Sequence, residues 1–414
     1  MSMELRGAQN RTAILQAEHA ATGAARYVTY ILTTYGTNGI MPNLTQNLPD
    51  FRTAGVPLGE AYFWLLGRND FSKLPEQPSF GLTDETSKLN LNTATLEQLQ
   101  LLPDMTAQFA AAIIDWRDTD SEPTENGAED ETYARLTPPR RTKNAPFETV
   151  EELRLVYGAT LQLLYGEDTN LNGILDLNEN DGDKSPPSDN SDGRLNSGIL
   201  EYVTVYTRQP STRADGSARV NISTPQGRQQ LRQVLTDRLG EDRSGELMSN
   251  LGGGNIPSVL QFYVISRMTA DEFAAIHTDI AASTNTQEGL VNVNTASEAV
   301  LACLPGIGVE HAPALVAFRA ANPSILNSMA WVAGVLEQEG IAQAGRFLTD
   351  QAYQFTADIA AVGASGRGFN RTRFVFDTSE GTPKVLLRRD LTSIGWPLGS
   401  AVRAEIQFAK ENQR

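Results

Sequence analysis

The chain has 414 residues, 40% of them hydrophobic, and a formal net charge of −16 at pH 7. This length exceeds one ordinary hydrophobic core, so roughly two to four domains are expected. The acidic balance disfavours binding to phosphate backbones or anionic membrane surfaces and favours hard cations, and the single cysteine, Cys303, excludes a disulfide within the chain.

A helix is predicted near the start of the chain. Residues 11–36 place apolar side chains on one stripe at helical spacing, from Ile14 to Tyr35. No clear N-cap precedes this stripe, so the segment is compatible with the lower part of a longer helix. No run of eighteen apolar residues occurs, so the sequence as given predicts neither a transmembrane helix nor a secretory signal.

An internal repeat is the strongest pattern within the chain. Residues 89–118 match residues 291–320 without a gap, sharing Asn-(Leu/Val)-Asn-Thr-Ala and then Leu-Pro; residues 220–224 are a weaker third copy. Thr93 and Thr295 precede the helical runs and are predicted to be N-caps. The Leu-Pro pair breaks each helix, and glycines supply a tight turn in the second copy. Each copy is therefore predicted to be a helical hairpin.

The region between the hairpins carries two local patterns. Residues 150–164 are predicted as a single helix that leads into an acidic loop. The runs 202–207 and 218–222 flank a polar turn, Ala-Asp-Gly-Ser, and are predicted to pair as a local β-hairpin.

The acidic loop, DTNLNGILDLNE, has the spacing of a helix–loop calcium site. Oxygen donors stand at its first, third, fifth, ninth and twelfth positions, the seventh residue offers its carbonyl, and a glycine at the sixth permits the bend. The predicted ligands are Asp168, Asn170, Asn172, Ile174, Asp176 and Glu179. Eight carboxylates lie between residues 167 and 192 against one lysine, and this density favours bound Ca²⁺ over a metal-free solvated loop.

Strands are predicted at the two ends of the chain. The runs 60–67, 353–362, 371–377 and 384–390 are rich in β-branched and aromatic residues, and they are expected to form one antiparallel sheet with the N-terminal helix. The fold class is therefore α+β, with a helical domain at 87–350 inserted between core segments 1–86 and 351–414. The insert is expected to contain repeat one at 87–165, the calcium loop region at 166–198, a middle segment at 199–288 and repeat two at 289–350.

The hairpins admit two functional interpretations. Helix-hairpin-helix units of the competence type bind DNA phosphate on the backbone amides of a Gly-Ile-Gly turn, with basic residues nearby. The second copy has this turn, but Glu310 lies near it and Arg319 is the only basic residue close by; the first copy has Asp104 instead. We therefore favour packing modules, with a DNA-binding protein as the alternative.

Catalysis finds little support in the sequence. His19, His277 and His311 have no nucleophile or metal-ligand neighbours at useful spacing, and no Walker loop, nucleophile elbow or His-Glu-x-x-His motif occurs. No enzyme is predicted.

Together these motifs resemble the type II secretion system minor pseudopilin K family. The resemblance follows chain order and covers most of the sequence, through Leu-Thr-Asp-Glu at 82–85, Lys-Leu-Asn-Leu-Asn-Thr-Ala at 88–94, Asp-Trp-Arg-Asp at 115–118, Gly-Ala-Glu-Asp at 127–130 and Pro-Phe at 146–147. It implies a pilin-like core, made from the N-terminal helix and the sheet. It also implies that the inserted domain contains two helix-hairpin-helix or SAM-like repeats and binds calcium, with Asp118, Asp120, Glu129 and Asp130 as a second candidate site.

The resemblance also implies a structural role in protein export. Family members lie in the inner membrane and periplasm and cap the pseudopilus tip with the minor pseudopilins I and J. We therefore expect an inner-membrane anchor, formed by an N-terminal helix segment absent from this chain, and a periplasmic soluble part of which this chain is a truncated piece. No nucleic acid is expected as a partner.

Overall fold

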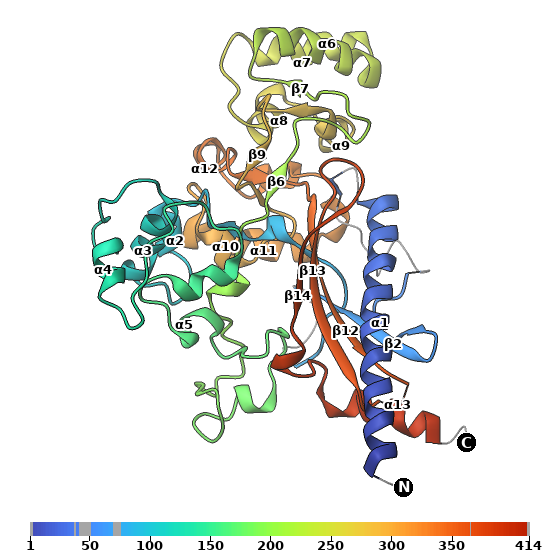
Figure 1. Ribbon diagram of the computed structural model, residues 1–414. Coiled ribbons are helices and arrows are strands. Elements are labelled where there is room, and N and C mark those ends of the chain that lie inside the picture. The colour runs from blue at the N-terminus through green and yellow to red at the C-terminus, as the bar shows by residue number, and fades with distance from the viewer. Residues whose placement is uncertain (1–2, 37–38, 41–50, 69–75, 365, 412–414) are drawn as a thin grey trace.

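The computed structural model describes residues 3–36, 39–40, 51–68, 76–364 and 366–411. A long helix and a sheet stand on one side of the molecule, and a mainly helical region lies on the other side with a lobe above it (Figure 1). The protein is thus a mixed helix and sheet fold with an antiparallel sheet, as the sequence predicts.

The main sheet draws strands from both ends of the chain. Its hydrogen-bonded order is β1-β2-β12-β13-β14, β3 also pairs with β12, and every pair is antiparallel. The strands are β1 (Val56–Leu58), β2 (Ala61–Leu66), β3 (Thr83–Asp84), β12 (Gln354–Val362), β13 (Phe369–Asp377) and β14 (Lys384–Asp390). The prediction that the four longest runs share one antiparallel sheet is therefore confirmed.

Helix α1 (Met3–Tyr35) lies along one face of this sheet. Its alanine-rich stripe is buried together with Val28 and Ile31 against aromatic residues of β12 and β13. Small residues let the backbones approach closely, because a Cβ on Gly363 or Gly368 would lie 2.4 or 2.5 Å from Ala13 backbone atoms. The predicted helix is confirmed, although Ile14 and Tyr35, the two ends of the predicted stripe, are exposed.

No helix in the described part of the chain is both long enough and apolar enough to span a bilayer.

The helical region begins after η1 (Glu85–Ser87). Its first part contains β4 (Leu89–Asn90), α2 (Leu96–Gln100), α3 (Ala107–Arg117), α4 (Asp130–Ala134), η2 (Val150–Leu155), α5 (Leu161–Tyr165), η3 (Leu177–Glu179), η4 (Ile199–Glu201), β5 (Val203–Thr204) and β6 (Arg208–Gln209). The upper lobe in Figure 1 contains β7 (Val220–Asn221), α6 (Pro225–Leu239), α7 (Glu241–Leu251), α8 (Val259–Ser266), α9 (Ala270–Ala274), η5 (His277–Asp279) and β8 (Ile280–Ala281).

The last part of the helical region returns the chain to the sheet. It contains β9 (Gln287–Glu288), β10 (Val291–Asn292), α10 (Glu298–Ala302), α11 (Gly308–Ala321), η6 (Pro323–Ile325), η7 (Ala330–Gly334), α12 (Gln338–Ala344) and β11 (Leu348–Thr349). After β14, η8 (Thr392–Ile394) and a helix that the sequence did not predict, α13 (Gly399–Glu411), complete the described chain.

Three copies of one local structure recur in the helical region. The strand that opens each copy pairs in parallel with a short strand from later in the chain, as β4 with β5, β7 with β8 and β10 with β11. The asparagine that ends this strand accepts a hydrogen bond from the amide two residues on, at 2.8 Å for Asn90, 2.9 Å for Asn221 and 3.0 Å for Asn292. The weak third copy in the sequence therefore has the same start as the two strong ones.

The N-caps of the two hairpins lie two residues later than the sequence predicts. Thr95 caps α2 and Ser297 caps α10. Thr295 instead donates its hydroxyl to the buried carboxylate of Asp84, at 2.6 Å. Thr295 therefore makes a tertiary contact, which spacing alone could not distinguish from a cap.

Two other local predictions are wrong. Residues 150–164 do not form one helix, because the chain turns at Gly158 with a φ of +86° and α5 begins after its own cap, Thr160. The runs 202–207 and 218–222 do not form a hairpin, since β5 and β7 pair with β4 and β8. Partners distant in sequence displaced the local pairing in both runs.

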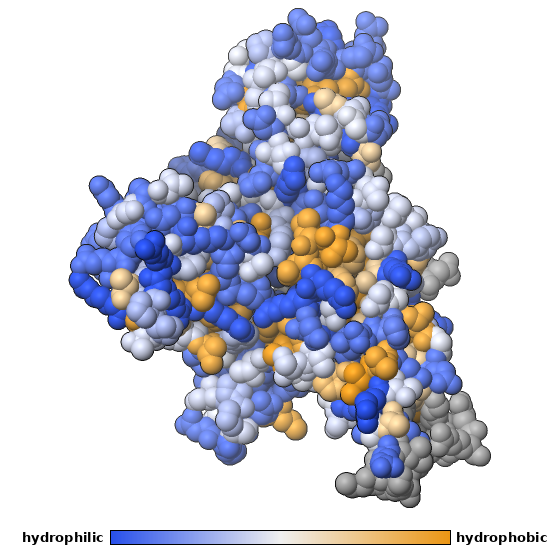
Figure 2. Space-filling model, viewed as in Figure 1, coloured by the Kyte–Doolittle hydropathy of each residue, from blue (hydrophilic) through white to orange (hydrophobic). Residues whose placement is uncertain are grey.

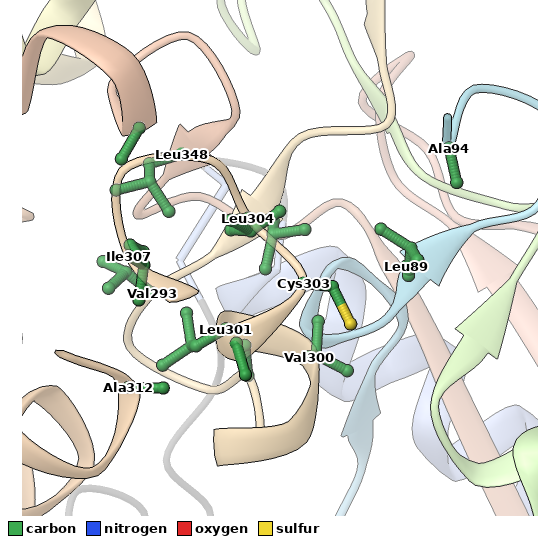
Figure 3. Packing of buried hydrophobic residues seen from close by; sticks show 14 of the residues in the cluster. Leu89, Ala94, Val293, Val300, Leu301, Cys303, Leu304, Ile307, Ala312 and Leu348 are labelled. Atoms are coloured by element: carbon green, nitrogen blue, oxygen red, sulfur yellow. The ribbon is translucent and has the colours of Figure 1, made fainter. Parts of the chain in front are cut away.

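Buried apolar residues gather in two clusters. The smaller cluster lies between α1 and the main sheet, and the larger cluster fills the helical region from Leu89 to Leu348. Leu301, Leu304, Ile307 and Val293 of the second hairpin lie together within the larger cluster (Figure 3). The surface is mostly hydrophilic with several apolar areas, one of which lies over β13 and β14 (Figure 2). Val385 and Leu386 of β14 are exposed.

Candidate cation-binding loop

The acidic loop follows α5 and ends in the single turn η3. The structure buries three of its six predicted ligands almost completely, with exposed fractions of 1% for Asp168, 3% for Asn172 and 1% for Glu179. Gly173 has a φ of +69°, so it makes the bend for which position six requires glycine. Ile174 is also buried and packs its aliphatic side chain inward.

Hydrogen bonds within the loop draw the predicted ligands together. The Asp168 carboxylate accepts from the amides of Asn172 and Gly173, both at 2.9 Å. One oxygen of Asp176 accepts from the side-chain amides of Asn170 and Asn172, at 2.8 and 3.0 Å. This network gathers oxygen-bearing side chains around one turn of backbone without supplying a positive charge.

Glu179 closes the loop and carries an unpaired oxygen. Its Oε2 accepts from the Asp176 amide at 3.1 Å, whereas its buried Oε1 has no hydrogen-bond partner. Burial and the negative charges of Asp168 and Asp176 raise the pKa of Glu179 to about 8. Burial likewise raises the pKa of Asp168, against the opposing effect of the Arg68 charge.

The donor set fits a hard cation. Ca²⁺ binds carboxylate, amide and carbonyl oxygens, and two buried carboxylates with raised pKa values would be neutralised by such an ion. The orphaned Oε1 of Glu179 is the observation that separates this loop from an ordinary hydrogen-bonded turn, because buried acceptors normally have partners.

A second acidic cluster lies in the first repeat. Asp118, Asp120 and Glu129 place carboxylate oxygens within 4.8 Å of one another, and they are the one such trio in the described part of the chain. The three carboxylates of the loop are therefore less tightly grouped than these. Asp130 does not join the trio; its carboxylate accepts from the Thr142 amide at 2.8 Å.

Unsatisfied oxygens mark this cluster too. Oδ1 of Asp118 and both carboxylate oxygens of Glu129 are buried without a hydrogen bond. Burial raises the pKa of both residues, and neighbouring carboxylates raise it further. Asp115 lies beside them but is satisfied by the amides of Thr124 and Ala128, at 2.9 and 2.6 Å.

The hairpin arginines have an internal role. Arg319 is buried and donates to the carbonyl of Val293 at 2.8 Å, and Arg117 at the matching place in the first hairpin donates to the carbonyls of Leu91 and Ala94. Arg319, the one basic residue that the sequence placed near the Gly-Ile-Gly turn, is thus turned away from solvent. This arrangement favours packing modules over a phosphate-binding surface.

The three histidines and the cysteine differ in their burial. His19 and His311 are exposed, whereas His277 is buried and its Nδ1 lies 2.9 Å from the Asp350 carboxylate. Cys303 is buried among apolar residues, and burial raises the pKa of its thiol to about 12, which makes it unreactive at neutral pH. Sequence reasoning missed Arg68 and Arg371, which contact the backbone of the acidic loop from the sheet.

Comparison with known proteins identifies the machinery to which this architecture belongs. Two family models, both described as "Type II secretion system (T2SS), protein K", match residues 77–165 and 291–356, which include the two hairpins. A type II secretion system protein K from Pectobacterium carotovorum subsp. carotovorum is 47% identical over 55 residues, covering 13% of this chain and 17% of that protein. One from Klebsiella pneumoniae is 46% identical over 66 residues, covering 16% and 20%.

A solved structure also aligns with this chain. It is the GspK-GspI-GspJ complex from the type 2 secretion system of enterotoxigenic Escherichia coli, with 13% identity and a TM-score of 0.43, covering 94% of this chain and 99% of that one.

The two family-model matches define a component of the type II secretion system. The chain belongs to the protein K family of that system. The segments matched to the two curated relatives span 17% and 20% of their lengths.

Proposed function

We propose that this chain is a structural minor pseudopilin that caps the tip of a type II secretion pseudopilus together with the minor pseudopilins I and J. The observation that carries this proposal is α1, whose buried alanine-rich stripe packs on a sheet built from both ends of the chain. This pairing of one long helix with an antiparallel sheet suits a pilin-like core. The helical region then corresponds to a domain inserted at 87–350, with the hairpins as helix-hairpin-helix or SAM-like repeats.

The opposite face of α1 is suited to helix packing in a filament. Ile14, Leu15 and Tyr30 are exposed on the helix by 50%, 54% and 61%. Neighbouring pilin-like helices would bury this face. The helical region lies on the other side of the sheet from α1, with its lobe above (Figure 1). This bulk would obstruct the addition of another subunit above it.

Calcium is the proposed structural ion. Asp168, Asn170, Asn172, Asp176 and Glu179, with the carbonyl of Ile174, would hold it in the loop, and Asp118, Asp120 and Glu129 would hold a second ion. The ion would neutralise buried carboxylates and thereby stabilise the helical region; no catalytic step is assigned to it. The proposed location is the periplasm, with an anchor in the inner membrane.

Co-purification tests the filament role. Full chain carrying Leu15→Glu should lose association with minor pseudopilins I and J, because a charge on the exposed face of α1 would be buried in the complex. Leu161→Glu, on an exposed residue of α5, is the matched control and should associate normally. Equal recovery of both partners with Leu15→Glu and the unsubstituted chain would reject α1 as the contact face.

A gel-shift assay at low salt tests the DNA-binding alternative. We expect no retention of duplex DNA, since the net charge is −16 and Arg319 is buried. Salt-dependent retention at low protein concentration would instead favour the alternative.

A further inference from the structure

The backbone of the acidic loop is held from outside by two arginines of the sheet region. Arg371 on β13 donates to the carbonyls of Asn170 at 2.6 Å and Leu171 at 2.7 Å. Arg68, just after β2, donates to the carbonyl of Asn172 at 3.0 Å and also to that of Leu171. The three consecutive carbonyls at the third, fourth and fifth positions of the loop therefore accept hydrogen bonds from guanidinium groups.

Both arginines are also held by carboxylates outside the loop. Arg371 is fully buried, and Asp358 on β12 accepts from its Nε and Nη2 at 2.9 and 2.8 Å. Arg68 lies 3.4 Å from the Glu201 carboxylate. A planar guanidinium that is oriented in this way loses little further freedom when it binds carbonyls.

The conformation of the loop depends on these contacts. Leu171, whose carbonyl accepts from both arginines, has a φ of +54°, which is an uncommon conformation for a residue with a branched side chain. Gly173 leaves room for Arg68, because a Cβ there would lie 2.9 Å from its Cδ and Nε. The glycine that the calcium pattern demands for the bend is thus also the place where the sheet arginine packs.

A third contact ties the loop to the end of the chain. The side-chain amide of Asn172, a predicted ligand, donates to the carbonyl of Pro397 at 2.9 Å, between η8 and α13. The loop belongs to the helical region in sequence. Its hydrogen bonds attach it to three other segments: the end of β2, strand β13 and the C-terminal segment.

We infer that Arg68 and Arg371 are positioning residues for the cation loop, through which ion binding fixes the helical region on the sheet. By binding three carbonyls, the two arginines fix the backbone that carries the side-chain oxygens of the loop. The ion and the sheet then stabilise the same loop conformation, so each raises the affinity of the other by the same factor. This inference rests on the proposed calcium site, and it adds that the site controls the attachment of the two parts.

Calcium affinity and domain attachment are measured on the same full chain. Spin labels at Leu161→Cys on α5 and Leu386→Cys on β14 report the distance between the two parts; both positions are exposed, and the native Cys303 is buried. With calcium we expect a narrow distance distribution, and with a chelator a broad one. Calcium is also titrated calorimetrically into the unlabelled chain and into the Glu179→Gln variant. The difference between the two heats is the heat of calcium binding to the loop.

Arg68→Lys provides the decisive variant. Lysine keeps the positive charge but lacks the fork that reaches two carbonyls at once, so we expect about tenfold weaker calcium binding and a broadened distribution. Arg371→Lys should act in the same direction, but Arg371 is fully buried and its replacement can prevent folding; Arg68, at the edge of the buried region, keeps the test available. Arg388→Lys, on an exposed arginine of β14, is the matched control.

The outcomes separate the proposed coupling from the proposed calcium site. Weaker calcium binding and a broader distribution in Arg68→Lys, with Arg388→Lys unchanged, would support the coupling. Calcium binding by the loop with unchanged affinity and distances in Arg68→Lys would overturn the coupling while leaving the calcium site intact. Absence of any loop-specific calcium heat in the unsubstituted chain would overturn both, and co-purification with the partner pseudopilins would still test the filament role separately.

Discussion

The fully buried guanidinium of Arg371 donates to both carboxylate oxygens of Asp358, at 2.9 Å through Nε and 2.8 Å through Nη2. Arg373 adds a third bond to the same carboxylate at 2.9 Å. This group of charges lies where the sheet meets the acidic loop. Strands β12 and β13 therefore form a buried ion pair within the sheet, and Arg371 of this pair also attaches the sheet to the helical region.

Removing Arg371 should be strongly destabilising. Arg371→Leu would leave the Asp358 carboxylate buried with only one of its two arginine partners, and breaking a buried pair from one side costs about 3–5 kcal/mol. Arg388→Leu, at an exposed position in the same sheet, should change stability by only about 0.5 kcal/mol. Urea unfolding of both variants measures the difference. Similar midpoints for the two would mean that the buried pair contributes no more than a surface arginine.

The same carboxylate should make the protein sensitive to acid. Burial alone would raise the pKa of Asp358, but Arg371 and Arg373 hold it well below its usual range. Its stabilising contribution is therefore complete above the unfolded-state pKa of about 3.9 and is lost as the pH falls below that value. We expect Asp358→Asn to be less stable at pH 7 and to show a shallower loss of stability below about pH 4. Parallel pH profiles for variant and parent would contradict this.

His277 should contribute an opposite pH dependence. Burial lowers its pKa, but the adjacent Asp350 carboxylate raises it more, so the net shift is upward. A raised histidine pKa stabilises the fold fully below the unfolded-state value of about 6.5, and this contribution disappears as the pH rises through the folded-state pKa. Thermal unfolding between pH 6 and 9, about the range in which histidine titrates, should therefore show a decline that His277→Gln abolishes. His311→Gln, at an exposed position, should retain the decline.

Calcium should raise the melting temperature through the acidic loop. A hundredfold excess over the dissociation constant stabilises by about 2.7 kcal/mol. Glu179→Gln should remove most of this gain, yet the variant should match or exceed the parent in chelator, because a neutral amide replaces a buried carboxylate with an unpaired oxygen. Asp192→Asn, on an exposed residue outside the predicted ligands, is the control. Identical melting with calcium and chelator in the unsubstituted chain would rule out a stabilising ion.

Gly127 should tolerate no side chain. A Cβ at this position would lie 1.9 Å from Oδ2 of Asp115, the carboxylate that receives the Thr124 and Ala128 amides. Gly127→Ala should therefore destabilise the protein by about 1–3 kcal/mol through overpacking. Gly253→Ala meets nothing within 4 Å and should be neutral. Chemical unfolding of the pair would contradict the packing argument if both glycines accepted alanine equally.

Short-range patterns in the sequence were sufficient for much of the fold. The stripe of α1 and the β-branched runs of β2, β12, β13 and β14 have the periods of their secondary structures, and the repeated Asn-x-Asn-Thr-Ala motif predicted two similar hairpins. The same patterns failed where a distant partner decided the outcome. Residues 150–164 have helical spacing, yet Gly158 and Thr160 divide them, and β5 and β7 pair with strands far along the chain.

Some features of the acidic loop could also be predicted from the sequence, whereas others depend on the tertiary structure. The spacing of six ligand positions and the glycine at 173 depends on neighbouring residues, so the sequence alone indicates a candidate cation site. Which carboxylates are buried, and which oxygen lacks a partner, depends on segments that fold over the loop. No spacing rule could show that Arg68 and Arg371 bind its carbonyls, since Arg371 is 200 residues from Leu171 in sequence.

The sequence by itself therefore determined α1, the long strands, the repeat and the candidate ligands, because these follow from periodicity and local backbone geometry. Tertiary structure alone decided the order of the strands in the sheet, the burial of Arg319, and the contacts by which the sheet holds the acidic loop. Those features arise from burial and from hydrogen bonds between distant segments, whose free energies exist only once the chain is folded.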